Sequence, residues 1–237
     1  MEAAVPQAAQ AKAGRLAGIL FLFVNAAGVF AEVVVRGSLL QGDAMQVAQS
    51  VADSERLYRL GIAVDLTMLI GGLVLIWALY VLLGPVHRDL AFLAVLLRTV
   101  ETAATVAATV ASLVAVQLLG TADYLRVFAV GEVQGLSRLA RIAFGLGQDV
   151  GFIFLGLGSA VFAYLLLRSH YVPRILASWG VVASLLLAAY NLVAIVVPSV
   201  KTFVYIALVP MGIYEIGIGL WLVIKGVMLS GTPARAT

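Results

Sequence analysis

Charged side chains within apolar segments are the residues of this chain best placed to do chemistry. Arg98 and Glu101 lie three residues apart in a run, Leu90 to Leu119, that otherwise has the composition of a membrane helix. A charge at the bilayer centre costs about 2.5–3.5 kcal/mol, so such residues are kept where they pair, line water or bind something. The same reasoning along the chain gives nine candidate ligand-binding residues: Glu32, Arg36, Asp65, Arg98, Glu101, Asp149, Asn191, Tyr214 and Glu215.

The spacing of these residues predicts one polar face on each helix. Steps of three and four residues bring side chains onto the same helix face, and the polar residues from Arg98 to Ser112 follow such steps. The polar residues from Asn25 to Arg36 do the same. With helices that alternate in direction, every helix places polar groups between the midplane and one leaflet. We therefore expect the candidates to converge on one carboxylate–arginine cluster.

Acidic residues outnumber basic ones in this expected cluster. Its deep cation is Arg98, whose planar guanidinium can bridge two carboxylates. Glu101 is the expected first partner, and Asp65 or Asp149 is a candidate second partner. The surplus of acids predicts that the cluster takes up protons or a cationic ligand, since burial favours the neutral carboxyl.

The composition of the chain is that of an integral membrane protein. Of the 237 residues, 63% are hydrophobic and 11% are charged, with a mean hydropathy of +1.09. Soluble domains are about 25% charged. A spanning helix needs about 20 mainly apolar residues. Six segments satisfy this condition: 15–36, 58–84, 90–119, 138–168, 173–197 and 203–228.

We therefore expect an all-α integral membrane bundle of six transmembrane helices over residues 15–229. The short flanks, 1–14 and 230–237, are polar or Ala-rich and are expected to be disordered. Between the first two helices, Met45 to Leu57 carries a broken apolar stripe, which predicts either a short amphipathic helix at the interface or a solvated linker. A weak match between Gly18–Ser38 and Gly151–His170 raises the alternative of a 3+3 inverted repeat.

Several classes of site are disfavoured by residue content. The chain has no cysteine, and both of its histidines, His87 and His170, lie in predicted loops. No cofactor motif is visible, so no cofactor is expected, and the metal question stays open. The formal charge of +3 is spread along the chain, which gives no nucleic-acid patch. Positive charges divide evenly between the two sides, and the acidic residues of the longer loops favour cytoplasmic N- and C-termini.

Five stretches carry a resemblance to a known family: FAEVVVRGSLLQGDA, SERLYRLGIAVDL, YVLLGPVHRDLA, DVGFIFLGLGSAVFAYLLLRS and VPRILASWG. Together they resemble a bacterial polytopic membrane family catalogued as a domain of unknown function, DUF4386, over about Arg15 to Trp179. The resemblance implies about six membrane helices and the inner membrane of a bacterium. It implies no activity. It draws attention to the acids and bases at the family-like motifs: Glu32, Arg36, Asp65, Arg98 and Asp149.

Three functions remain open. The first is binding or transport of a small molecule or ion at the carboxylate–arginine cluster, in a homodimer if the short chain needs a second copy. The second is an accessory or assembly subunit of a membrane complex, whose buried charges select helix partners. The third is an intramembrane acid–base or hard-cation-dependent enzyme. The third is least favoured because no paired nucleophile and base occur in the sequence. The lipid bilayer is the partner common to all three.

Overall fold

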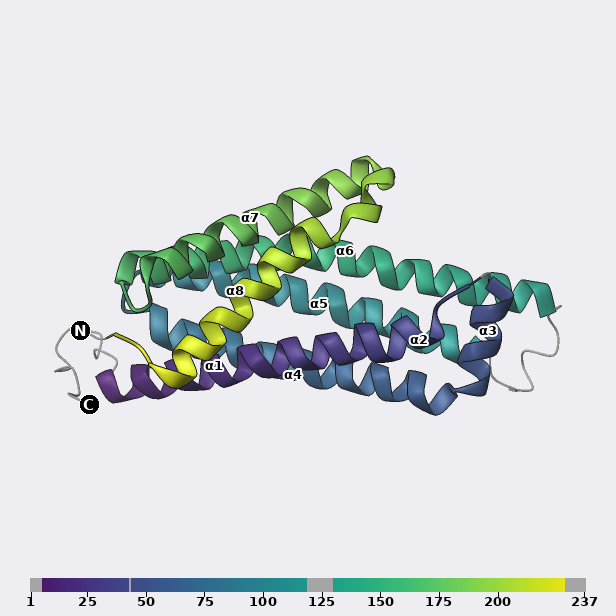
Figure 1. The fold of residues 1–237 in the computed structure, drawn as a ribbon, viewed down its shortest axis with the longest axis horizontal. Coiled ribbons are helices and arrows are strands. Elements are labelled where there is room, and N and C mark those ends of the chain that lie inside the picture. The colour runs from purple at the N-terminus through teal and green to yellow at the C-terminus, as the bar shows by residue number, and fades with distance from the viewer. Residues whose placement is uncertain (1–5, 43, 119–129, 229–237) are drawn as a thin grey trace. The chain divides into compact units, whose positions relative to one another are not determined.

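The structure is a computed structural model that describes residues 6–42, 44–118 and 130–228. Every regular element in these residues is helical (Figure 1). In chain order the elements are α1 (Gln7–Val29), the π-helix η1 (Phe30–Arg36), α2 (Gly37–Leu39), α3 (Ala44–Asp53), α4 (Glu55–Leu83), α5 (Arg88–Leu118), α6 (Val130–Ser169), α7 (Arg174–Val196), the 3₁₀-helix η3 (Pro198–Phe203) and α8 (Tyr205–Ile224).

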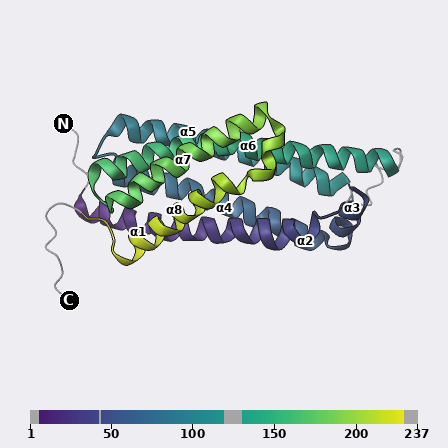
Figure 2. The ribbon, with the colours of Figure 1, turned by 45° about the horizontal axis from the view of Figure 1, so that its top comes forward.

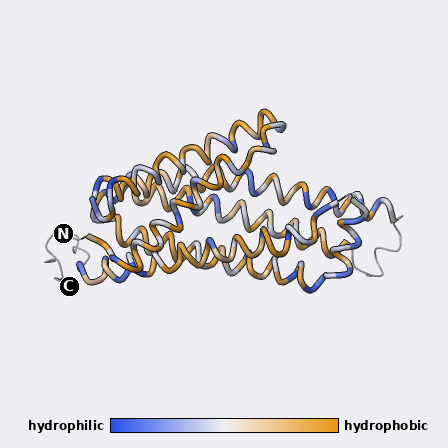
Figure 3. The backbone as a smooth tube through the Cα atoms, viewed as in Figure 1, coloured by the Kyte–Doolittle hydropathy of each residue, from blue (hydrophilic) through white to orange (hydrophobic). Residues whose placement is uncertain are grey.

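Six helices of the described part are long and apolar enough to cross a membrane. They are Gln7–Leu39, Glu55–Leu83, Arg88–Leu118, Gly131–Ser169, Arg174–Val196 and Tyr205–Ile224. Hydrophobic residues follow most of each long helix, and hydrophilic residues gather towards helix ends and connections (Figure 3). The predicted all-α membrane bundle with six spans is therefore confirmed. The inverted repeat stays a prediction.

The first helix begins earlier than expected. Residues 7–14 belong to α1, so the expectation that this segment is disordered is wrong. Alanine has the highest helix propensity, and proline is favoured at a helix start, as Pro6 is here. The Gln10 amide also donates hydrogen bonds of 3.5 Å to the carbonyl oxygen of Leu82 and to the hydroxyl of Tyr171. Residues 1–5 and 230–237, which we also expected to be disordered, lie outside the described residues.

Helix α6 also starts before the predicted position. It begins at Val130, whereas the apolar run predicted a start at 138. Its first two turns are polar and Gly-containing, so a search for apolar runs does not find them. Proline marks the later boundaries as expected: Pro173 precedes the first residue of α7, and Pro198 opens η3.

The chain forms two compact units. Unit 1 contains residues 1–25, 71–101 and 152–237, and unit 2 contains residues 26–70 and 102–151. Helices α1, α4, α5 and α6 each contribute residues to both units.

Small residues let the helices of unit 1 approach closely. A Cβ atom at Gly18 of α1 would lie 2.9 Å from the carbonyl oxygen of Gly219 in α8, and one at Gly219 would lie 3.2 Å from the carbonyl oxygen of Gly18. On α6, a Cβ atom at Gly156 would lie 2.5 Å from the carbonyl oxygen of Ser184 in α7. Helices α7 and α8 run side by side (Figure 2). These contacts join backbone to backbone, so glycine is required for packing.

Unit 2 has its own apolar core. Val47 and Val51 of α3 are buried against Val35, Tyr58 and neighbouring residues. The opposite face of α3 is polar and exposed, and Gln49 donates a hydrogen bond of 2.9 Å to Asp53. The segment between the first two spans is therefore an amphipathic helix rather than a solvated linker. Its apolar face covers the unit 2 core, and its position at a membrane interface stays a prediction.

Candidate polar sites in the membrane helices

The nine candidate residues fall into two sets. Unit 1 holds Arg98, Glu101, Asn191, Tyr214 and Glu215, and unit 2 holds Glu32, Arg36, Asp65 and Asp149.

Glu215 of α8 is held by an amide from the first helix. The Asn25 Nδ2 group donates a hydrogen bond of 2.9 Å to Glu215 Oε2 and a second of 3.0 Å to the carbonyl oxygen of Phe21. The second bond fixes the amide on its own helix, so that its remaining N–H points at the carboxylate. Asn25 was not among the nine candidates, although it shares the helix face of Glu32 and Arg36.

An arginine and a second carboxylate complete the group around Glu215. Arg98 Nη1 lies 3.7 Å from Glu101 Oε2, and the Arg98 residue is 7% exposed. The charges of both Arg98 and Glu101 act on the Glu215 carboxyl group. We call Asn25, Arg98, Glu101 and Glu215 the unit 1 cluster. Its two carboxylates and one guanidinium leave a net charge of −1 when all three are ionised.

A glycine on α6 makes the room for Arg98. A Cβ atom at Gly158 would lie 2.7 Å from Arg98 Cγ and 3.0 Å from its Cδ. The absence of a side chain there allows the arginine stem to lie flat against α6, with its guanidinium among the acids. Glycine at this position is thus part of the site.

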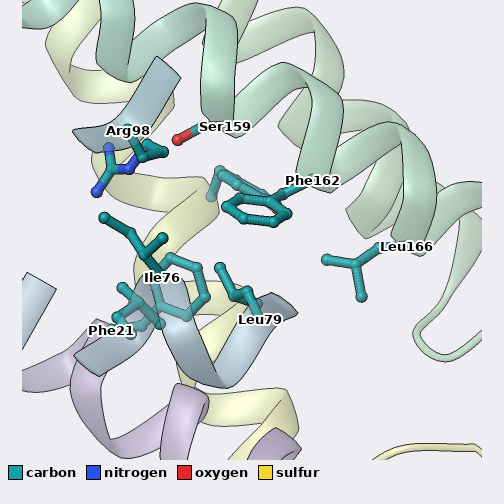
Figure 4. A pocket seen from close by; sticks show the side chains of 9 residues that line it. Phe21, Ile76, Leu79, Arg98, Ser159, Phe162 and Leu166 are labelled. Carbon is teal, nitrogen blue, oxygen red and sulfur yellow. The ribbon is translucent and has the colours of Figure 1, made fainter. Parts of the chain in front are cut away.

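A small cavity is lined in part by Arg98. It has a volume of about 10 Å³ and is lined by Arg98, Ser159, Tyr214 and apolar side chains that include Phe21 and Phe162 (Figure 4). A cavity of about 10–15 Å³ holds one water molecule if polar partners surround it. Three of the nine residues that line this one carry polar groups, and its volume corresponds to about one water molecule. Typical sites for organic ligands are about 300–1,000 Å³.

Two candidates of unit 1 have packing contacts of their own. Tyr214 is buried against α7, where a Cβ atom at Gly180 would lie 2.3 Å from its Cε2 atom. Asn191 is buried and donates a hydrogen bond of 2.8 Å to the carbonyl oxygen of Leu187 in its own helix. Tyr214 also lines the cavity. The side-chain hydrogen bond that Asn191 donates is made within α7.

Unit 2 contains a second arginine–carboxylate arrangement. Arg36 donates from Nη1 and Nη2 to the two oxygens of Asp65, at 2.8 and 3.3 Å, and from Nε to Glu32 at 2.6 Å. Its guanidinium carbon also lies 5.3 Å from the ring centroid of Phe144. We call Glu32, Arg36 and Asp65 the Arg36 triad. Asp65, a candidate partner of Arg98 by sequence, is bound here by Arg36.

The local backbone of the Arg36 triad is unusual. Glu32 and Arg36 both belong to the π-helix η1, and the N–H of Gly37 donates to the carbonyl oxygen of Glu32, five residues earlier. π-Helices are rare and are found frequently at functional sites. Asp149, the fourth candidate of unit 2, is half-buried on α6. Within residues 6–42, 44–118 and 130–228, no three His, Cys, Asp or Glu side chains are grouped to hold a metal ion.

Comparison with known proteins identifies the family. A sequence model of the family described as a domain of unknown function, DUF4386, matches residues 16–226. No curated protein and no solved structure matches the chain. Since the match covers most of the sequence, the chain belongs to the DUF4386 family.

Proposed function

We propose that this DUF4386 membrane protein binds a proton or a small monovalent cation at the unit 1 cluster, as the binding step of transport. The observation that carries the proposal is the charge balance around Glu215. Glu101 lies 3.7 Å from the guanidinium of Arg98, and the positive charge of Arg98 also acts on Glu215. The cluster becomes neutral when it takes up one positive charge, and a neutral group is favoured in the low-dielectric interior of a membrane.

The volume of the cavity beside the unit 1 cluster limits the size of the ligand that can bind there. A volume of about 10 Å³ admits a water molecule but no metabolite. A proton, or a small cation with few ligands, fits this space. Three oxygen- or nitrogen-bearing side chains, Arg98, Ser159 and Tyr214, line it beside the cluster. A single water bound there would give protons a hydrogen-bonded route towards the carboxylates.

Helix α8 contains a proline that could let Glu215 become accessible from one side of the membrane. Pro210 lies inside α8, on the N-terminal side of Glu215. Proline removes one backbone hydrogen bond and is a common cause of kinks in membrane helices. A change of bend at Pro210 would open the carboxylate of Glu215 to one side of the membrane, which is what a transport cycle needs.

Proton uptake into vesicles tests the proposal. Purified protein would be reconstituted into liposomes that contain a pH-sensitive dye, and the internal pH followed after an external acid step. We expect Glu215→Gln to slow protein-dependent uptake by about tenfold or more, equivalent to about 1.4 kcal/mol. The matched control is Glu55→Gln, which changes an exposed carboxylate that pairs with Arg59 at 2.6 Å. Wild-type vesicles that acidify no faster than empty ones, with and without Na⁺ or K⁺, would refute transport of these ions.

A structural role is the second candidate function, and the Arg36 triad favours it. There both carboxylates are bound by one arginine, as in ion pairs that select helix partners. An accessory or assembly subunit would need no flux. If Glu215→Gln lowers the unfolding temperature strongly while the wild-type protein shows no proton or cation uptake, the charges of the unit 1 cluster hold helices together.

We further propose that the chain lies in the cytoplasmic membrane of a bacterium with both ends on the cytoplasmic side. Six spans place the two ends on the same side, and the longer connections carry more acidic residues. The chain has no cysteine, so single-cysteine variants can be labelled without background. Cysteines at positions 3 and 234 should react with a membrane-impermeant maleimide only after cell lysis. Labelling of intact cells at either position would contradict this orientation.

A further inference from the structure

Two arginines of α6 lie together without an acidic partner. Arg138 and Arg141 are three residues apart, which places them on one helix face. The charge of Arg138 acts unfavourably on Arg141. Throughout the described residues, no carboxylate forms an ion pair with either guanidinium. The pair therefore carries two positive charges that no carboxylate of the described residues balances by an ion pair.

The Arg141 guanidinium is held in place by neutral groups. Its Nη1 donates a hydrogen bond of 2.9 Å to Ser137 Oγ, and the buried Ser137 hydroxyl donates one of 3.1 Å to the carbonyl oxygen of Ala115 on α5. Ser137 thus fixes one N–H of Arg141 at a set position. A guanidinium has five N–H donors, so further donors remain for a ligand.

A tyrosine of a second helix also acts on Arg141. Tyr58 of α4 is close enough to Arg141 to interact electrostatically. The Tyr58 hydroxyl is itself bound to Ser112 Oγ of α5 at 2.8 Å. The charged and titratable groups that act on Arg141 are therefore Arg138 on its own helix and Tyr58 on α4, and neither is an aspartate or a glutamate.

The length of α6 places this pair at headgroup depth. The helix has 40 residues, whereas a hydrocarbon core of about 30 Å is crossed by about 20 helical residues. With Ser169 at the outer edge of one headgroup layer, which is about 5–7 Å thick or about 3–5 helical residues, the hydrocarbon core ends near position 145. The whole bilayer, about 40–45 Å with its headgroups, corresponds to about 27–30 residues and ends near Arg141. Arg138 and Arg141 therefore fall where lipid phosphates lie.

We propose that Arg138 and Arg141 form a binding site for the phosphate of an anionic phospholipid headgroup. Guanidinium groups bind phosphate oxygens through paired N–H donors, which makes arginine well suited to this task. Arg141, held by Ser137, provides the fixed donors, and the exposed Arg138 provides the second charge. A phosphatidylglycerol headgroup carries the single negative charge that a diester phosphate presents without a compensating ammonium.

Native mass spectrometry of the full chain tests the lipid site. Protein in mild detergent would be titrated with phosphatidylglycerol or phosphatidylcholine. We expect the wild-type protein to retain phosphatidylglycerol preferentially, and Arg141→Gln and Arg138→Gln each to reduce its apparent affinity by about tenfold. Arg59→Gln is the matched control, because Arg59 is an exposed arginine of the same unit that already pairs with Glu55. Its lipid binding should equal that of the wild type.

The outcomes separate the lipid from other anions. Equal retention of the two lipids, or unchanged binding in both variants, would overturn the proposal. Displacement of phosphatidylglycerol by millimolar inorganic phosphate would assign the site to a free anion instead of a lipid. Arg138 donates no hydrogen bond within the described residues, so Arg138→Gln keeps the protein folded even if Arg141→Gln does not, and its titration then decides the result.

Discussion

Removing the charge of Asp65 should destabilise the protein strongly. The Asp65 side chain is 5% exposed and accepts two hydrogen bonds from Arg36, whose side chain is 15% exposed. In Asp65→Asn the buried guanidinium loses its main counter-charge. Breaking a buried ion pair by removing one partner costs about 3–5 kcal/mol. Glu32 still accepts the bond from Arg36 Nε, but its side chain is 70% exposed, so we expect a loss near the lower end, about 3 kcal/mol.

The double replacement should behave differently from the single one. In Arg36→Met combined with Asp65→Leu, no charge is left unpaired in the core of unit 2. Replacing a buried ion pair by apolar residues of similar volume is often neutral or stabilising. We therefore expect the free energy of unfolding of this double variant to lie above that of Asp65→Asn, by about 2 kcal/mol or more.

Equilibrium unfolding in detergent, followed by tryptophan fluorescence, measures these differences. Glu55→Gln is the control, since the Glu55–Arg59 pair has similar i,i+4 geometry to Glu32–Arg36 but is exposed on both sides. Exposed pairs contribute about 0–1 kcal/mol. The reasoning fails if Asp65→Asn is no more destabilised than Glu55→Gln. It also fails if the double variant is less stable than Asp65→Asn, because the cost would then come from lost packing.

Two further predictions concern glycine contacts and a buried hydroxyl pair. Gly156→Ala should lower the free energy of unfolding by about 1–3 kcal/mol, because the new Cβ would lie 2.5 Å from the carbonyl oxygen of Ser184. Gly72→Ala, whose new Cβ meets nothing within 4 Å, should instead stabilise α4 by up to about 1 kcal/mol, and thermal unfolding that ranks these two variants in the opposite order would contradict the packing. Tyr58→Phe removes the hydrogen bond of 2.8 Å to Ser112 and should cost about 1 kcal/mol in the same unfolding measurement, whereas a double variant with Ser112→Ala should cost little more, and strictly additive losses would show that the two hydroxyls do not interact.

The sequence predicted the membrane helices well because length and hydropathy alone decide whether a segment spans a bilayer. It failed where helix formation has another cause. Residues 7–14 are helical through alanine propensity and the bonds of Gln10, neither of which raises hydropathy. The first turns of α6 are helical despite their glycines and polar residues. The π-helix η1 leaves no mark on a pattern of apolar residues, since FAEVVVR reads equally well as α-helix.

The sequence was enough to select buried polar residues, but it did not predict which of them contact one another. Depth and residue type selected Glu215, Arg98 and Glu101, and the structure places Arg98 Nη1 3.7 Å from Glu101 Oε2. Asp65 was selected correctly as a buried acid, but its partner is the arginine at the end of η1. Partner choice depends on helix rotation and packing, which a single sequence does not specify. For the same reason Asn25, a bound amide, and Ser159, a cavity hydroxyl, were not among the candidates.

The contact between α1 and α8 has a consequence for how the protein is made. Gly18 and Gly219 meet backbone to backbone, and Asn25 binds Glu215 on the same pair of helices. A ribosome synthesises α1 first and α8 last, so neither contact can exist until the sixth span has entered the membrane. Unit 2 uses residues 26–70 and 102–151 alone and is complete while α7 and α8 are still unmade. Biogenesis therefore has a fixed order, in which the unit 1 cluster is assembled only when α8 meets α1.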